Sequence, residues 1–155
     1  HHFAALADEY YTSSVSYETG GTEHPEPWEP NVTADGAHPK WMELVDPGVP
    51  LPTPWDKEAY EEHQRTYQAE RNRLREANVP ESEMDAFFRG EQAWATQFLA
   101  SQKYAGKVGA FEGAAYEAKG LYRPEVDCIM FTRNEVGFCR VCTRAIHRVI
   151  DMYAK

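Results

Sequence analysis

Three cysteines, Cys128, Cys139 and Cys142, lie near the C-terminal end of the sequence. The last two have the CxxC spacing, which occurs in zinc half-sites, thiol redox pairs and disulfides. Zinc is the least favoured of these, since a structural ion takes four ligands and neither a second CxxC nor an HxxxH follows. Thr143 stands where c-type haem attachment has histidine, and no βαβ pattern supports a redox protein. We predict one disulfide from Cys128 to Cys139 or Cys142, with a closed CxxC or three buried thiols as alternatives.

The composition indicates one compact domain and argues against two kinds of partner. The 155 residues are 42% hydrophobic and 13% aromatic, which is typical of a chain that buries a core. The formal net charge of −9, without a basic stripe, argues against nucleic acid, because phosphate contacts need Lys and Arg. No apolar run approaches the roughly 18 residues of a membrane span, and no leader sequence is visible.

The first third of the chain is predicted to be a short helix followed by irregular chain. Apolar residues at positions 3, 6, 7 and 10 indicate an amphipathic helix over residues 1–10. Residues 12–55 contain eight of the ten prolines, and proline lacks the N–H that a central strand donates. We therefore expect residues 12–55 to form an irregular surface wrap, called here the wrap, pinned by Trp28, Trp41 and Trp55.

Residues 56–104 are predicted to form an antiparallel helical hairpin. Asp56 is the expected N-cap of a first helix that ends near Asn78, and Pro80 opens a second that ends near Tyr104. The first helix is so polar that most of it should face solvent.

Residues 105–155 are predicted to contain little sheet and one clear helix. Residues 108–116 suggest a short Gly-rich strand or bulge, and residues 120–133 suggest irregular chain. A continuous apolar stripe from Phe138 to Tyr153 predicts a terminal helix packed along the core.

The opening string HHFAALADEYY resembles the segment HExxHxFxxLADEY of the IgA peptidase family, which comprises zinc endopeptidases related to the metzincins. His1 falls on the second zinc histidine of that segment. Three further patches resemble the family in the same order: PN…KW…PTP within residues 30–54, FEGAAYEAKGLYRPEVDCIM over residues 111–130, and FCRVC over residues 138–142. Four patches in one order, spread over nearly the whole chain, argue against chance.

The resemblance implies that this chain carries the second half of a zinc site. His1 would be one ligand, while the first histidine and the general-base glutamate would lie upstream, so no catalytic residue is expected within the chain. Asp8 would be the third ligand, with Glu9 as the alternative. A straight helix would separate the Cα atoms of His1 and Asp8 by about 10 Å along its axis. The chain must therefore turn between Ala4 and Asp8, or Asp8 is not the ligand.

Three further residues take site roles from the same resemblance. Met130 looks like the Met-turn methionine that packs beneath the zinc histidines, so we expect it to contact His1. Glu112 and Tyr116 are candidates for the wall of the cleft near the metal.

The fold that the resemblance implies is α+β with helices dominant, the C-terminal part of a metzincin-like catalytic domain. The implied function is zinc-dependent hydrolysis of peptide bonds in a protein or peptide substrate, performed by the intact, secreted protein in an extracellular or periplasmic location. The chain alone should be inactive. The alternative is a catalytically inactive binding or structural module that meets a protein partner through the wrap or the acidic hairpin. An HExx sequence before His1 would favour the enzyme.

Overall fold

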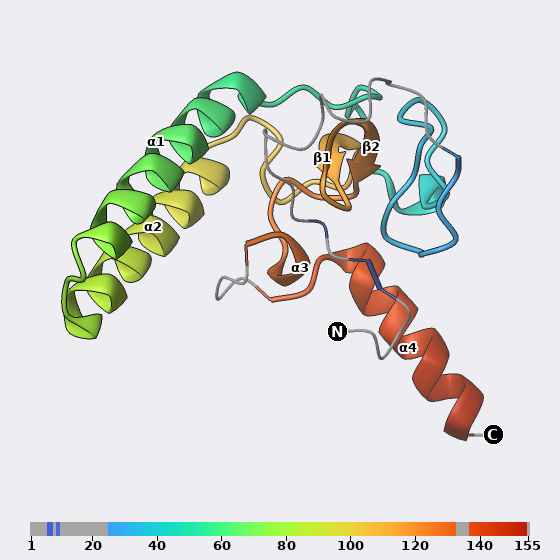
Figure 1. The fold of residues 1–155 in the computed structure, drawn as a ribbon. Helices are drawn as coiled ribbons and strands as arrows, with labels where there is room; N and C mark the ends of the chain where they lie inside the picture. Colours follow the sequence, from blue (N-terminus) through green and yellow to red (C-terminus); the bar gives the residue numbers. More distant parts are fainter. Residues whose placement is uncertain (1–5, 8, 10–24, 133–136, 155) are drawn as a thin grey trace.

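The computed structural model describes residues 6–7, 9, 25–132 and 137–154. Its elements, in chain order, are the 3-10 helix η1 (Met42–Leu44), α1 (Lys57–Glu76), α2 (Glu81–Ala100), β1 (Phe111–Ala114), β2 (Glu117–Arg123), α3 (Ile129–Thr132) and α4 (Arg140–Ala154). Helices dominate and β1 pairs with β2 in a two-stranded sheet, so the fold is α+β as predicted. The α1–α2 pair extends to one side of the body and α4 to another (Figure 1). No described helix is long and apolar enough to cross a membrane.

The predicted helix over residues 1–10 lies mostly outside the described residues. Leu6, Ala7 and Glu9 are described, and none of the three has regular secondary structure. Leu6 is nevertheless buried in the same core cluster as Met130 and Val141. The N-terminal segment therefore packs into the body of the molecule at this point.

Aromatic side chains hold α1 and α2 together. Tyr67 of α1 stacks on Phe87 of α2 with ring centroids 5.0 Å apart, and His63 of α1 stacks on Trp94 of α2. Tyr60 is the buried residue of α1, so most of this charged helix faces solvent, as its polar sequence predicts. The hairpin is stabilised along a narrow aromatic seam.

The base of the hairpin is closed by hydrogen bonds between the chain that enters it and the chain that leaves it. The Thr53 N–H donates to the Ala110 carbonyl at 2.8 Å, and the Asp56 N–H donates to Gln102 Oε1 at 2.8 Å. Asp56 is the N-cap residue of α1, as predicted, but its side chain makes no capping hydrogen bond. Pro80 directly precedes α2, in accord with its ability to start a helix without a free N–H.

Two of the three tryptophans attach the wrap to β1 and to the chain that leads into it. Trp41 is fully buried, and its indole N–H donates to the Gly109 carbonyl at 2.7 Å. Trp55 donates to the Glu112 carbonyl at 3.2 Å. Trp28 is 76% exposed, so the prediction that it also pins the wrap is wrong.

The two strands form a hairpin around a turn that lacks glycine. Ala114 pairs with Glu117, and the two residues between them, Ala115 and Tyr116, have φ values of 50° and 69°. Positive φ at both central positions is the geometry of a type I′ turn, which normally uses Asn and Gly. A bulge between Glu112 and Ala114 interrupts the register.

This hairpin corrects the prediction for residues 120–133. Irregular chain was expected there, but β2 runs to Arg123 and α3 begins at Ile129. The strand was missed because Ala115 and Tyr116 carry no turn signal, so nothing marked the preceding strand as half of a hairpin.

The apolar stripe of α4 packs against the core as far as Val149. Val141, Cys142 and Ala145 are buried, whereas Ile150 is 48% exposed and Tyr153 is 84% exposed. The predicted core packing along the whole apolar stripe is therefore wrong for its end, from Ile150 onward, because the helix extends beyond the body that would cover it (Figure 1).

Two glycine-to-alanine substitutions test how tightly the wrap packs against the chain that leads into β1. A Cβ at Gly109 would lie 2.1 Å from Thr53 Oγ1 and 2.9 Å from Val49 Cγ1. Gly109→Ala should therefore lower the free energy of unfolding by about 1–3 kcal/mol through overpacking. Gly90→Ala is the control, since Gly90 lies in α2 and a Cβ there would meet nothing within 4 Å. It should raise stability by about 0.5–1 kcal/mol. Urea unfolding of both variants measures the contrast, and equal effects would contradict the contact.

Candidate functional site

The segment around residue 9 is hydrogen-bonded to the chain around Met130. The Glu9 N–H donates to the Met130 carbonyl at 2.8 Å, and Met130 is 7% exposed. His1 and Asp8 lie outside the described residues, so the expected contact between Met130 and His1 stays a prediction. The structure shows that the end of the N-terminal motif meets α3, the short helix that holds the candidate Met-turn residue.

Asn31 of the wrap also holds this segment through side-chain hydrogen bonds. Its side-chain amide accepts from the Ala7 N–H and donates to the Ala7 carbonyl, each at 2.8 Å. It also donates to Glu9 Oε2 at 3.0 Å. Asn31 and Thr33 are buried, so the Asn31-Val32-Thr33 glycosylation sequon is closed to modification in the folded protein. Sequence reasoning missed this role because the paired groups are more than twenty residues apart.

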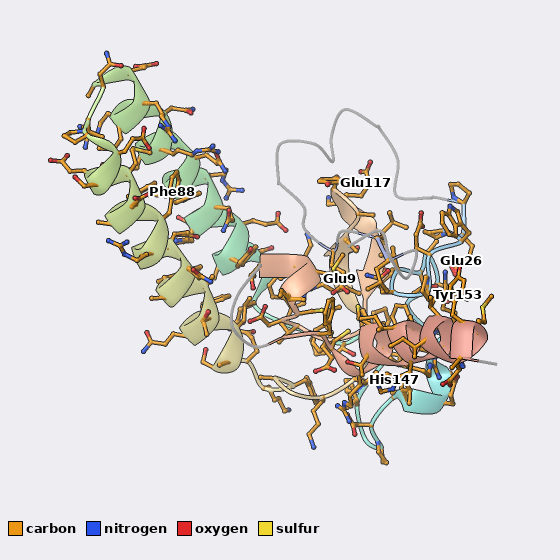
Figure 2. All side chains as sticks on the ribbon, turned by 90° about the horizontal axis from the view of Figure 1, so that it is seen from below. Glu9, Glu26, Phe88, Glu117, His147 and Tyr153 are labelled. Carbon is orange, nitrogen blue, oxygen red and sulfur yellow. The ribbon has the colours of Figure 1, made fainter. Side chains whose placement is uncertain are left out.

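The carboxylate of Glu9 is enclosed in the body of the molecule beside α3 (Figure 2). Its Oε2 atom accepts hydrogen bonds from Asn31 and from Cys142 Sγ, the latter at 3.2 Å. Its Oε1 atom has no hydrogen-bond partner among the described residues. Desolvation raises the pKa of Glu9 well above its usual range, and the nearby Cys128 raises this pKa further. Burying a carboxylate whose second oxygen has no partner lowers the stability of the fold unless a charge or a hydrogen-bond donor compensates it.

The three cysteines gather around this carboxylate as free thiols. Cys128 precedes α3, Cys139 directly precedes α4, and Cys142 lies in the first turn of α4. The sulfur atoms of Cys128 and Cys142 are 3.9 Å apart, whereas a disulfide bond is about 2.05 Å long. The predicted disulfide is therefore absent from the structure, although the segments that it was expected to join do meet.

Hydrogen bonds concentrate negative charge on one of the three sulfur atoms. The Cys139 thiol, then the Cys142 thiol, lowers the pKa of Cys128 to about 3, and the backbone N–H groups of Met130 and Cys139 contribute in the same direction. The same pairing with Cys128 raises the pKa values of Cys139 and Cys142. The cluster therefore resists carrying three thiolates at once unless a cation is present.

Arg123, at the end of β2, is a second buried charge that sequence reasoning missed. Its guanidinium donates to the backbone carbonyls of Glu112, Gly113 and Val126 at 2.8–3.3 Å. It lies 3.8 Å from the centroid of the Phe131 ring. Its charge also acts through space on Glu9, where it lowers the pKa against the effect of burial. Arg123 thus connects the β1–β2 hairpin to the chain that leads into α3.

A hollow lies on the other side of α3, between this helix and the α1–α2 hairpin. Tyr116 and Met130 line it together with residues from both hairpin helices, including Tyr67 and Phe88. Glu112 does not line this hollow, and one of its carboxylate oxygens accepts from the Gly120 N–H at 3.3 Å. Of the two residues predicted to line a cleft, Tyr116 thus lines the same hollow as Met130, and Glu112 does not line it.

Comparison with known proteins assigns the chain to a family. The family model described as IgA Peptidase M64 matches residues 1–150. The chain belongs to the IgA peptidase M64 family. No curated protein matches the sequence. Membership indicates a protease and a protein substrate at the level of the family, and the α+β fold is consistent with part of a peptidase domain.

In this IgA peptidase M64 chain, the residues predicted to do chemistry fall into two groups. Glu9, Met130 and the three cysteines converge on α3 and the start of α4. His1 and Asp8 cannot be placed, because both lie outside the described residues. The convergence of Glu9 with the cysteines was missed, since no sequence spacing links residue 9 to residues 128–142.

Proposed function

We propose that the intact protein hydrolyses peptide bonds with a zinc ion and that this chain supplies His1 and Asp8 to that site. The family match over residues 1–150, which includes the motif HHFAALADEY, is the observation that carries the proposal. A zinc ion in such a site activates water and polarises the scissile carbonyl. The first histidine and the general-base glutamate are supplied from upstream of His1.

The described residues support Asp8 rather than Glu9 as the third ligand. The Glu9 carboxylate is buried and hydrogen-bonded to Asn31 and Cys142, so it is already engaged away from solvent. Its backbone N–H is fixed by the Met130 carbonyl. These contacts hold Glu9, at the end of the motif, against the helix that carries the candidate Met-turn residue.

The hollow beside α3 is the proposed binding region for the substrate. Tyr116 is 51% exposed at the tip of the β-hairpin and presents its ring there. Gln64 and Gln68 of α1 offer amides, and Phe88 of α2 offers an apolar surface. A mixture of aromatic and amide groups suits an extended peptide, which has both backbone polar groups and side chains to accommodate.

The test compares neighbouring histidines in the protein with its natural upstream residues. We expect His1→Ala to reduce cleavage of a fluorescent casein substrate to background and to remove one zinc ion. His2→Ala should keep both the cleavage activity and that zinc ion. Asp8→Ala should behave like His1→Ala. A chelator should abolish the activity and added zinc should restore it.

Two results would refute this proposal. Equal activity of the His1 and His2 variants would exclude His1 as a ligand. An upstream sequence without HExx, together with no cleavage of any substrate, would favour the binding module, whose partner surface would then be sought on the wrap or the hairpin.

A further inference from the structure

The side chains of Glu9, Cys128, Cys139 and Cys142 have the composition and the spacing of a closed metal site. One potential ligand atom from each residue lies within 4.8 Å of all the others, and all four residues are buried. A tetrahedral zinc ion with Zn–S bonds of about 2.3 Å requires S···S distances of about 3.8 Å and S···O distances of about 3.5 Å. The Cys128–Cys142 sulfur distance is 3.9 Å and the Cys142 Sγ–Glu9 Oε2 distance is 3.2 Å.

An independent observation indicates that a ligand belongs in this cluster. Glu9 is fully buried, and its Oε1 atom has no hydrogen-bond partner among the described residues. Leaving a buried carboxylate oxygen unpaired costs stability, and such atoms in native proteins call for an explanation. A cation at the centre of the cluster supplies a partner of opposite charge for this carboxylate, which can bind it through either oxygen.

The backbone around the cysteines is arranged to stabilise sulfur ligands. The N–H groups of Cys139 and Met130 donate to Cys128 Sγ at 3.2 and 3.5 Å. The Cys142 N–H donates to Cys139 Sγ at 3.4 Å. Cys142 also lies in the first turn of α4, where the helix dipole favours a thiolate.

The alternatives account for less of this arrangement. A disulfide between Cys128 and Cys142 would remove the hydrogen bond from Cys142 to Glu9 and leave the buried carboxylate without a cation. A redox pair needs access to a partner, but Cys139 is 5% exposed and the other two cysteines are fully buried. The expectation that zinc was the weakest assignment rested on a missing fourth ligand, and Glu9 provides one from 133 residues before Cys142.

We propose that Glu9, Cys128, Cys139 and Cys142 bind a structural zinc ion, separate from the proposed catalytic one. The site is closed, with four protein ligands and no open position, as structural zinc sites are. Binding exchanges the protons of the three thiols, and any proton on Glu9, for Zn²⁺, and the protons pass to solvent. The ion joins the end of the N-terminal motif, the chain before α3 and the start of α4.

The experiment uses the protein with its upstream residues, carrying His1→Ala so that the proposed catalytic ion is absent. We expect this variant to retain one zinc ion after dialysis. Replacement of that ion by Co²⁺ should produce near-ultraviolet absorption from thiolate-to-cobalt charge transfer, which a histidine and carboxylate site cannot produce. Cys142→Ser and Glu9→Gln should lose the ion or bind it far more weakly.

Val141→Ala is the matched control for packing. Val141 is buried between the two CxxC cysteines but has no ligand atom, so this variant should keep both the zinc and the cobalt spectrum. If Cys142→Ser does not fold, Cys142→His restores a ligand and should bind cobalt with a weakened charge-transfer band.

Measurements on the His1→Ala protein without any further substitution can overturn the proposal. A cobalt-loaded sample without thiolate charge-transfer absorption would exclude the site, as would a mass lowered by the two hydrogens of a disulfide. Failure of peptidase activity would not affect these readouts, because the absorption reports only sulfur bound to metal.

Discussion

Arg123→Met should lower the free energy of unfolding by about 3–5 kcal/mol, because it removes hydrogen bonds from buried carbonyls and each acceptor left unpaired costs about 1–3 kcal/mol. The guanidinium satisfies the carbonyls of Glu112, Gly113 and Val126 in the interior. Methionine has a similar length but donates nothing, so the Gly113 and Val126 carbonyls lose the hydrogen bonds from Arg123, while the Glu112 carbonyl keeps the one from Trp55. The through-space charge that lowers the pKa of Glu9 is also lost.

Arg140→Met is the matched control for Arg123→Met. Arg140 pairs with Asp46 at 2.6 Å, but its side chain is 49% exposed, so the ion pair is screened by solvent. We expect its loss to cost less than about 1 kcal/mol. Chemical denaturation monitored by tryptophan fluorescence measures both variants. If both arginine variants lose the same small amount, the buried carbonyls do not depend on Arg123.

Trp41→Ala should cost about 3–5 kcal/mol, the usual range for truncating a fully buried aromatic side chain. The indole fills the core cluster that also contains Val108 and Met130, and its N–H holds the Gly109 carbonyl. Truncation opens a cavity and leaves that carbonyl unpaired. Trp41→Phe keeps most of the volume and isolates the loss of the hydrogen bond, which we expect to cost about 1–3 kcal/mol.

Trp28→Ala provides the comparison within the same segment. Trp28 is 76% exposed, so its removal should change stability by less than about 0.5 kcal/mol. Thermal unfolding of the three variants should rank Trp41→Ala as the least stable, then Trp41→Phe, then Trp28→Ala. A wrap that unfolds equally with either tryptophan removed would mean that Trp41 does not attach it to the sheet.

The elements that the sequence predicted well are those whose signal is local. The α1–α2 hairpin follows from Pro80 and from apolar residues at helical spacing, and the start of α4 follows from Val141, Cys142 and Ala145. Helical periodicity indicates which face is apolar, but it does not show how far the body extends to cover it. That is why the exposed end of α4 was not foreseen.

The parts that were missed depend on contacts between distant residues. Arg123 is an ordinary arginine in sequence, and only the packing of Phe131 and three carbonyls around it makes it an interior group. Glu9 was considered only beside Asp8, as a ligand for the ion held by His1. Its position among the cysteines depends on a chain reversal that no short-range pattern encodes.

The closed base of the α1–α2 hairpin has a consequence for how this family can vary. Because Thr53 bonds to Ala110 and Asp56 bonds to Gln102, residues 57–100 leave the body and return to it at one place. Lengthening or shortening both helices by matched turns at the Asn78 end would change little at that base, since loop closure entropy grows slowly with length. The length of the α1–α2 hairpin beyond the body can therefore change while the base, the cysteine cluster and the sheet stay as they are.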